Sequence, residues 1–364
     1  MKVDHKQIHP NFKINGNHFN RKELYSVAYS FVKEGEEFEE KIGNFLLDWL
    51  NDDYDTIKVR TSGSTGDPKT YFIDKQKMVN SALATGKFFK VFENTTALLC
   101  LPADYIGGRM MIVRAMVLGW DLDIVEPKLN PLDKLFKTYD FCAMTPFQMD
   151  NSLGRLHLVK KLIVGGGAVS ENLIGLIQGI PTKIYEAYGM TETISHIAAR
   201  RLNPKAEIKE KKPFKALPNV SVSQNEKNCL VIKAPKILDQ ELVTNDIVEV
   251  LTYKKFFWKG RLDNVINSGG VKIYPESVEK KLQKLITYRF FISGIAHDSL
   301  GEQVVLFIEA PQSDKYLSDL KEAMDKLSTF DKYEKPKSIY LIDKFEETNS
   351  GKINRRQTLK KLMS

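Results

Sequence analysis

The sequence predicts a mixed α/β fold, with a large N-terminal α/β domain that includes a β-rich subdomain and a small, mobile α+β C-terminal domain. Helical patterns and short apolar runs alternate between residues 75 and 185, as in a sheet covered by helices. From about residue 217, β-like runs follow one another instead. At roughly 100–200 residues per domain, a length of 364 residues favours two domains. We place the boundary near Asp263, which gives domains of residues 1–262 and 263–364.

Hydrophobic periodicity predicts the elements of the N-terminal domain. Residues 37–50 carry apolar side chains on one helical stripe, and residues 75–92 and 110–118 are also expected to be helical. Glycine-rich and hydroxyl-rich loops follow several short apolar runs, at the strand ends where ligands of such sheets bind. The predicted strands cover residues 56–59, 97–101, 122–125, 141–144, 162–164 and 183–185.

The remaining elements belong to the β-rich subdomain and to the C-terminal domain. Strands are expected at residues 220–223, 229–233 and 247–251, before a turn at residues 260–264. In the C-terminal domain, the patterns predict helices at 277–285 and 318–327 and strands at 304–309 and 339–342.

Composition places the chain among ordinary globular proteins, because 42% of its residues are hydrophobic and 27% are charged. The three cysteines are far apart and lack metal-ligand spacing, which favours a reducing compartment. The first residues lack an apolar signal core, and no apolar run approaches the roughly 18 residues of a membrane span. We therefore expect a cytoplasmic protein without a membrane span.

A net charge of +8 is compatible with a nucleic-acid-binding protein. However, the basic residues are spread along the chain among acidic ones, and the densest run, residues 209–215, is short and contains Glu210. We therefore expect no nucleic-acid partner. The basic surface is interpreted as one that attracts anionic substrates.

Residues 61–69 are the strongest local signal, with four hydroxyl side chains, two glycines and one lysine. Glycines let backbone N–H groups approach a polyphosphate, hydroxyls donate to phosphate oxygens, and lysine adds positive charge. This is not a Walker loop, because Lys69 follows Gly66 by three positions. Taken alone, a segment of this composition is more often a flexible Gly/Ser turn. The candidate ATP-binding residues are Thr61, Ser62, Gly63, Ser64, Thr65, Gly66 and Lys69.

Two further motifs change that balance. Thr191 and Glu192 follow the Tyr188-Gly189 pair, and a carboxylate beside a triphosphate is suited to hold Mg²⁺, which prefers oxygen ligands. Lys352 lies in the segment 348–353 near the C-terminus. Each of these residues alone is compatible with an ordinary surface position.

In this order and spacing, the three motifs resemble the adenylate-forming superfamily of acyl-CoA synthetases, luciferases and peptide-synthetase adenylation domains. The resemblance runs from residue 57 to residue 361, and Asn245 departs from it where the family usually has glycine. It implies an adenine-contacting loop at Gly165, Gly166, Gly167 and Ala168, nucleotide contacts from Tyr188 and Gly189, ribose contacts from Asp246 and Arg261, a hinge at Asp263, and CoA contacts from Gly269 and Gly270.

The resemblance also implies a two-step reaction on ATP, a small-molecule carboxylic acid and CoA, with Mg²⁺ at Glu192. The carboxylate attacks the α-phosphorus to give acyl-AMP and pyrophosphate, while Lys352 stabilises the developing charge. The small domain then rotates about Asp263, which withdraws Lys352 and lets the CoA thiolate attack the acyl-AMP. Thr191, Glu192 and Lys352 are thus the implied catalytic residues.

Residues 101–109 resemble the segment of this family that lines the acyl pocket, and they contain Tyr105 and Gly108. Arg114 interrupts the apolar run that follows. It is either a surface arginine or, because a charge inside an apolar helix tends to be paired or functional, an anchor for a second substrate carboxylate. Ser195 is a second candidate for this pocket, and His196 is interpreted as a packed histidine.

The o-succinylbenzoate–CoA ligases of menaquinone biosynthesis carry an arginine at this spacing and act on a dicarboxylic acid. The chain is similar to short members of that group. The alternatives are another acyl- or aryl-CoA synthetase and a non-catalytic nucleotide-binding scaffold. Because only 60 residues precede the phosphate loop, fewer than is typical of the family, we expect a shortened N-terminal subdomain. Its loss would leave a smaller sheet in a monomer or expose apolar surface that favours a homodimer.

Overall fold

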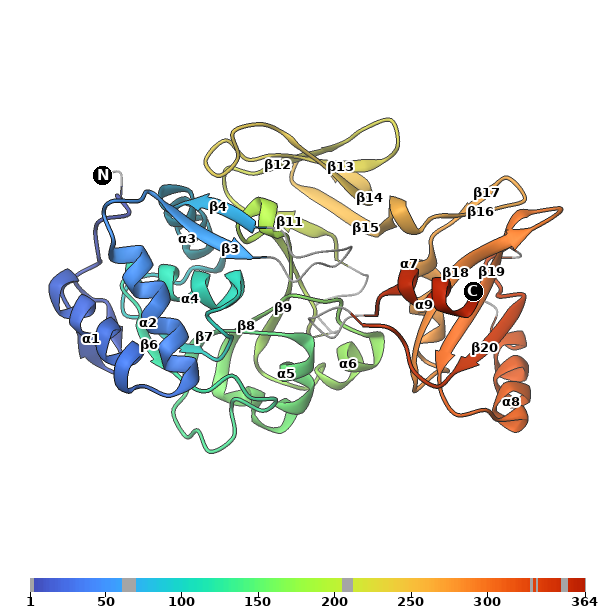
Figure 1. The fold of residues 1–364 in the computed structure, drawn as a ribbon, viewed down its shortest axis with the longest axis horizontal. Helices are drawn as coiled ribbons and strands as arrows, with labels where there is room; N and C mark the ends of the chain where they lie inside the picture. The colour runs from blue at the N-terminus through green and yellow to red at the C-terminus, as the bar shows by residue number, and fades with distance from the viewer. Residues whose placement is uncertain are drawn as a thin grey trace.

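A computed structural model of the chain describes residues 3–60, 70–204, 212–327, 330–331, 333–347 and 353–363. Helices and strands alternate along most of this length, so the predicted mixed α/β class is confirmed. The N-terminal helices lie at one end of the molecule and the C-terminal sheet at the other (Figure 1).

A large sheet joins 13 strands among the described residues, and its middle is parallel. Five parallel strands lie side by side in the order β9-β8-β7-β5-β6. The connections of β5 and β7 leave in opposite directions, which creates a switch point at their carboxyl ends, where ligands of such sheets bind. These strands are β5 (Thr96–Leu99), β6 (Asp121–Ile124), β7 (Tyr139–Met144), β8 (Val159–Val164) and β9 (Lys183–Gly189).

The parallel strands are buried on both faces because helices cover each side (Figure 1). Successive side chains point to opposite faces, so Leu99 and Phe141 contribute to one apolar cluster, whereas Leu98 and Cys142 contribute to another. The first cluster includes side chains of α3 (Lys75–Phe89) and α4 (Ile106–Leu118). The second includes side chains of α5 (Pro146–Asn151) and α6 (Glu171–Leu176).

The N-terminal segment forms a hairpin and two helices. Strand β1 (Lys13–Ile14) pairs in parallel with β6 and antiparallel with β2 (Asn17–His18). Asn20 and Glu23 form a capping box that fixes the start of the first helix. The second helix has the predicted bounds and buries Phe45 and Trp49. The other elements are α1 (Arg21–Glu34), α2 (Glu37–Leu50), β3 (Thr56–Arg60) and β4 (Thr70–Asp74).

Beyond β9 the large sheet continues with antiparallel strands. Most of them fall in the region from about residue 217, where the sequence predicted successive β-strands. This part lies between the helical end and the C-terminal sheet (Figure 1). Its strands are β10 (His196–Arg201), β11 (Phe214–Ala216), β12 (Ser221–Gln224), β13 (Cys229–Lys233), β14 (Leu242–Thr252) and β15 (Lys255–Arg261).

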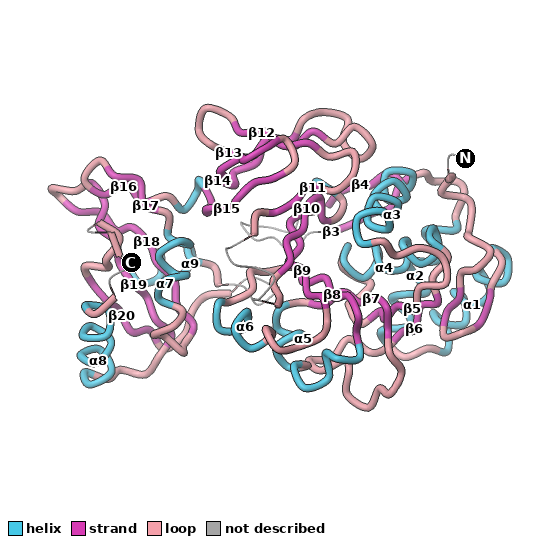
Figure 2. The backbone as a smooth tube through the Cα atoms, turned by 180° about the vertical axis from the view of Figure 1, so that it is seen from behind, coloured by secondary structure: helices cyan, strands magenta, loops and turns pink. Residues whose placement is uncertain are grey.

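The described C-terminal residues form a separate five-stranded sheet with three helices, which Figure 2 shows at one end of the molecule. Val278, Leu306 and Leu320 belong to an apolar cluster built from this part alone. The domain boundary near residue 263 stays a prediction. The elements are β16 (Ile266–Ser268), β17 (Val271–Ile273), α7 (Pro275–Leu282), β18 (Arg289–His297), β19 (Gly301–Glu309), α8 (Asp314–Asp325), β20 (Ser338–Ile342) and α9 (Arg355–Met363).

Several predicted boundaries differ from the structure by a few residues, and two of the differences affect candidate site residues. Tyr188 belongs to β9, whereas the sequence pattern ended that strand at residue 185; antiparallel pairing with β10 extends it. Helix α4 begins at Ile106 rather than at residue 110, although its first turn contains Gly107 and Gly108. Packing of the whole helix in the core outweighs the low helical propensity of glycine here.

Within the described residues, no helix combines the length and apolar character that crossing a membrane requires.

Candidate active site

The predicted site residues of the parallel sheet lie along one edge, at the carboxyl ends of its strands. Residues 165–168 follow β8 directly, and Thr191 and Glu192 come just after β9. Residues 166–168 of the loop after β8 are exposed, and Gly166 has a φ of +83°. The loop ends at Ser170, which caps the N-terminus of α6. A left-handed glycine with accessible backbone N–H groups is suited to close approach by a planar or anionic ligand.

Asp246 is the centre of a second group of site residues. Its side chain is buried, with 6% exposure. Its Oδ2 accepts a hydrogen bond of 2.6 Å from the Tyr188 hydroxyl, and its Oδ1 accepts one of 3.0 Å from the Trp258 indole N–H. Burial and the Asp246 charge raise the pKa of Tyr188, so the hydroxyl stays protonated as a donor. Two donors thus fix the orientation of one carboxylate.

The sequence patterns missed Trp258, because an aromatic residue in a strand normally indicates packing alone. Strands β14 and β15 are antiparallel, and Asp246 stands opposite Arg261 in their register. This pairing brings Trp258 within reach of Asp246. Arg261 also approaches the carboxylate, with 3.9 Å between Nη1 and Oδ1, and its Nη2 donates to Asp263 Oδ2 at 2.6 Å.

In the nucleotide site that the family resemblance implies around Asp246, replacing Trp258 with phenylalanine is expected to raise the KM for ATP about tenfold, because Asp246 loses a charge-assisted hydrogen bond of about 1.5 kcal/mol. The change in kcat should be smaller. Steady-state kinetics with varied ATP would measure both. Trp120→Phe is the matched control, since the buried Trp120 indole has no hydrogen-bond partner among the described residues. Equal changes in the two variants would contradict the role of the indole N–H.

Glu192 lies in a short 3-10 turn, Thr191–Thr193, directly after β9. It is exposed, and its Oε1 accepts a hydrogen bond of 2.9 Å from the Tyr71 hydroxyl of β4. Ile194, the next residue after the turn, has a φ of +67°, an unfavourable conformation for a β-branched side chain. The buried Thr193 supports the turn, because its hydroxyl accepts from the Met190 N–H at 3.0 Å.

Gly189 closes this turn against β10. A Cβ atom at this position would lie 2.4 Å from the Ser195 carbonyl oxygen and 2.5 Å from His196 Cα. We expect Gly189→Ala to cost about 1–3 kcal/mol of stability by overpacking and to lower activity by moving Ser195. Chemical denaturation would measure the first effect. Gly154→Ala is the control, because its new methyl group would meet no atom within 4 Å; a similar loss there would argue against a steric cause.

The start of α4 carries the predicted acid-pocket residues Tyr105 and Gly108. Tyr105 stands at the N-cap and is 48% exposed. Gly108 is buried, and a Cβ there would lie 2.3 Å from the Pro102 carbonyl oxygen. The first turn of α4 therefore packs directly against the backbone of residues 101–102.

Arg114 lies on α4 with only 2% of its surface exposed, which excludes the surface alternative. Its Nη2 donates to Ser195 Oγ at 2.7 Å and lies 3.3 Å from His196 Nδ1. Its Nε donates to Thr85 Oγ1 at 3.3 Å. The fold thus brings α3, α4 and the start of β10 together around one guanidinium. Arg114 and Ser195, which the sequence suggested for the acid pocket, are in direct contact.

No carboxylate pairs with Arg114 in the part of the chain that the structure describes. Burial lowers the pKa of Arg114 to about 9, so the guanidinium is still charged at neutral pH. Burial and the neighbouring Arg114 also hold the pKa of His196 well below its usual range. His196 is thus a buried, neutral histidine, as expected from the sequence. In addition, its ring contacts the Arg114 guanidinium.

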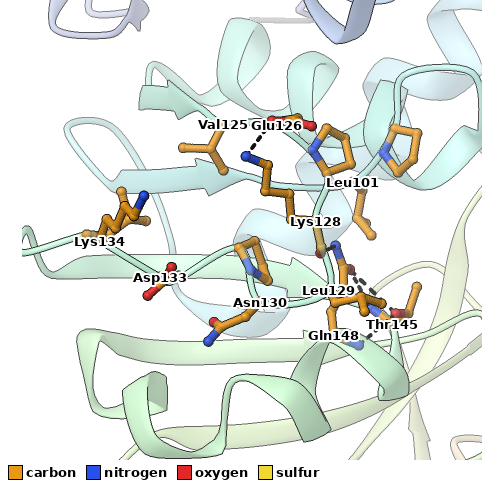
Figure 3. A pocket seen from close by; sticks show the side chains of 14 residues that line it. Leu101, Val125, Glu126, Lys128, Leu129, Asn130, Asp133, Lys134, Thr145 and Gln148 are labelled. Carbon is orange, nitrogen blue, oxygen red and sulfur yellow. Dashed lines mark hydrogen bonds and ion pairs between the residues drawn. The ribbon is translucent and has the colours of Figure 1, made fainter.

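A cleft of about 1030 Å³ opens at the switch point between β5 and β7 (Figure 3). Leu101 and Pro102 line it on one side and Thr145 and Gln148 on another. Gln148 Nε2 donates to the carbonyl oxygens of Cys100 at 2.8 Å and Lys128 at 3.1 Å, which joins the loops after β5 and β6. Among the described residues, the cleft walls adjoin the segment that leads to Tyr105 but do not include Arg114.

The remaining predicted residues lie in three places. Gly269 and Gly270 form the exposed turn between β16 and β17 with φ values of +58° and +81°, as a two-residue hairpin turn with two left-handed positions requires. Asp263 is exposed in the short turn Leu262–Asn264. The phosphate-loop candidates at 61–69 and Lys352 lie outside the described residues.

Comparison with known proteins identifies the family. A model of the family "AMP-binding enzyme" matches residues 60–227, a range that includes the predicted phosphate loop and Glu192. The crystal structure of an acyl-CoA synthetase (AMP-forming)/AMP-acid ligase II-like protein from Dyadobacter fermentans is 35% identical, with a TM-score of 0.59, over 90% of this chain and 95% of that one. The chain belongs to the AMP-binding enzyme family. The predicted resemblance to adenylate-forming enzymes is thereby confirmed.

Further relatives of this AMP-binding enzyme have names that specify a substrate. The chain is 25% identical to the 2-succinylbenzoate–CoA ligase of Enterococcus faecalis over 328 residues, which cover 80% of this chain and 67% of that relative. The corresponding ligase of Listeria monocytogenes is 24% identical over 385 residues, with 93% and 81% coverage. The o-succinylbenzoate CoA synthetase of Bacillus subtilis, solved with ATP and magnesium, shares the fold at 19% identity, with a TM-score of 0.68 over 83% of this chain and 69% of that one.

Proposed function

We propose that this enzyme, an AMP-forming acyl-CoA ligase, activates a small dicarboxylic acid and that its substrate is o-succinylbenzoate. The observation that carries the proposal is the buried Arg114, for which the described residues supply hydrogen bonds but no counter-charge. Removing an ion from water costs several kcal/mol unless an opposite charge compensates. A second carboxylate on the substrate would provide that compensation while the first carboxylate reacts.

The guanidinium geometry supports this assignment. The Nη1 amino group of Arg114 has no hydrogen-bond partner within the described part of the chain, so its hydrogens are available to a substrate oxygen. Hydrogen bonds between a guanidinium and a carboxylate are charge-assisted and roughly twice as strong as neutral ones. Ser195 contacts Arg114 and lies three residues from Glu192, so at most about 10 Å separates the Cα atoms of Ser195 and Glu192. One contact of the proposed anchor and the proposed metal ligand thus belong to the same short segment after β9.

The names of the relatives support the same acid, since several of them are 2-succinylbenzoate–CoA ligases at about 25% identity. Another acyl- or aryl-CoA synthetase remains the alternative at this level of identity. The two functions differ in whether they need Arg114, because a monocarboxylic acid has no second carboxylate for Arg114 to bind.

The nucleotide is proposed to bind across the carboxyl edge of the sheet. Residues 165–168 and Tyr188 would contact adenine, and Asp246 and Arg261 would bind the ribose hydroxyls. The hydroxyls and Lys69 of the 61–69 loop would hold the phosphates. The exposed Glu192 fits Mg²⁺ chemically, because this ion binds through one or two carboxylates together with substrate phosphates, and it would neutralise phosphate charge when bound.

In the proposed reaction, the substrate carboxylate attacks the α-phosphorus and pyrophosphate leaves. Lys352 would stabilise the charge that develops on the reacting oxygens, with support from Thr191 and Glu192. The CoA thiolate then attacks the acyl carbonyl of the adenylate, and AMP leaves. Gly269 and Gly270 are proposed to line the path of CoA in this second step.

We further propose that residues 263–364 form a mobile domain that turns about Asp263 between the two steps. In the present arrangement, α6 and α7 are joined by an ion pair of 2.5 Å between Lys280 Nζ and Glu171 Oε1. The Glu171 N–H also donates to Gln283 Oε1 at 3.0 Å. The side chains in these contacts are half-buried and would regain water on separation, so a rotation would break the two contacts at modest cost.

The decisive test is a panel of acids assayed for ATP-dependent pyrophosphate release, with and without CoA. The panel should contain o-succinylbenzoate, benzoate, acetate and medium-chain acids. The proposal expects o-succinylbenzoate to give the highest kcat/KM and a CoA thioester when CoA is present. Preference for a monocarboxylic acid would overturn the substrate assignment. Absence of acid-dependent pyrophosphate release across the panel would favour a non-catalytic scaffold.

A further inference from the structure

We infer that Thr85 and His196 are positioning residues for acid selection, which hold the Arg114 guanidinium in one orientation that presents its Nη1 amino group to the substrate. This inference rests on the proposed role of Arg114 as the carboxylate anchor. It adds two residues, one on α3 and one on β10, that no motif of the sequence indicated for this task.

Thr85 is fully buried and links three groups through its hydroxyl. Its Oγ1 donates to the Ser81 carbonyl oxygen at 3.0 Å and accepts from Arg114 Nε at 3.3 Å. The same oxygen lies 3.4 Å from His196 Nε2. Because the single hydroxyl proton is used by the carbonyl, Thr85 Oγ1 acts toward Arg114 and His196 only as an acceptor.

The protons of His196 follow from these contacts. A guanidinium has no acceptor atom, so the 3.3 Å contact with Arg114 Nη2 favours an unprotonated His196 Nδ1, which can also accept from the Ser195 hydroxyl at 3.3 Å. The proton of the neutral imidazole is then on Nε2, where it donates to Thr85 Oγ1. The ring is also held edge-on to Phe89, with 5.8 Å between ring centroids. In this arrangement Nδ1 accepts from Arg114 and Ser195, and Nε2 donates to Thr85.

Together these bonds fix two of the three guanidinium nitrogens. Nε is held by Thr85, Nη2 by Ser195 and His196, and Nη1 is left without a partner in the described part of the chain. Arginine side chains carry about 2 kcal/mol of rotamer entropy. Fixing the guanidinium before the acid binds avoids losing that entropy on binding, so the network should act on acid affinity rather than on ATP.

The test compares Thr85→Val with Thr182→Val. Both threonines are buried, at 0% and 2% exposure, and each donates one hydrogen bond to a carbonyl oxygen. Only Thr85 contacts Arg114. We expect Thr85→Val to raise the KM for o-succinylbenzoate about tenfold, equal to 1.4 kcal/mol, with little change in the KM for ATP. Thr182→Val should leave both constants unchanged, and Thr85→Ser, which keeps the hydroxyl, should restore the acid KM.

His196 is tested by a pair of variants. Asparagine can place an acceptor oxygen near the position of Nδ1, whereas leucine has none. His196→Leu is therefore expected to raise the acid KM as Thr85→Val does, and His196→Asn to restore most of it. Nitrogen-15 NMR of the histidine rings in the native enzyme should show His196 as the neutral Nε2–H tautomer. A protonated ring, or the Nδ1–H tautomer, would overturn the inference.

Arg114→Met separates this inference from the proposed function. If Arg114→Met leaves the preference for o-succinylbenzoate over benzoate unchanged, the dicarboxylate proposal fails. If that preference falls in Arg114→Met but not in Thr85→Val and His196→Leu, with folding verified by thermal unfolding, the proposal stands and the positioning role is wrong.

Discussion

Arg114→Ala is expected to lower kcat/KM for o-succinylbenzoate by roughly 30- to 5,000-fold, which corresponds to about 2–5 kcal/mol of transition-state binding. The size follows from the burial of Arg114: with the guanidinium removed, the second carboxylate would lose its counter-charge at a site with little access to water. Steady-state kinetics with varied acid at saturating ATP would measure the change. The loss should fall mainly on the acid and not on the KM for ATP.

Two comparisons, one of variants and one of substrates, show whether the loss is due to the charge of Arg114. Arg114→Met fills much of the same volume without the charge and should be as impaired with o-succinylbenzoate as the alanine variant. With benzoate, which lacks the second carboxylate, both variants should keep the native kcat/KM or exceed it. An unchanged kcat/KM for o-succinylbenzoate in either variant would favour the alternative acyl- or aryl-CoA synthetase.

Asp246→Ala is expected to lower kcat/KM for ATP by about 150-fold, or about 3 kcal/mol. The change removes the proposed acceptor for the ribose hydroxyls. It also leaves the Tyr188 hydroxyl and the Trp258 indole N–H without their partner. Calorimetric titration with a non-hydrolysable ATP analogue would measure the loss of binding directly.

Asp239→Ala is the matched control for this variant. Asp239 is exposed and, among the described residues, forms an ion pair only with Lys77 at 2.6 Å; exposed pairs of this kind contribute about 0–1 kcal/mol. We expect native ATP affinity for Asp239→Ala. Native affinity for Asp246→Ala as well would show that the ribose is bound elsewhere.

Much of the fold follows from local patterns. The helix at residues 37–50 has the predicted bounds, because its apolar stripe has the period of a helix that packs one face on a core. The short strands β5 to β9 were each predicted within a few residues, since parallel strands buried on both faces read as short apolar runs. Such patterns depend only on neighbours along the chain.

Strand ends and strand pairing were harder to predict. The extension of β9 through Tyr188 depends on its partner β10, and β18, which was not predicted at all, gains its hydrogen bonds from β19. The partners of a strand can be far away in the sequence, so a local pattern does not encode them.

The sequence by itself determined the family chemistry, because the loop at 61–69, Glu192, Asp246, Arg261 and Lys352 form a spaced series of motifs. It also indicated Arg114, a lone charge in an apolar run. Only the tertiary structure decided what surrounds that charge. Thr85 and His196 stand 29 and 82 residues from Arg114 along the chain, and Trp258 reaches Asp246 through strand register. Contacts of this kind arise from packing of distant segments, and no local spacing in the sequence records them.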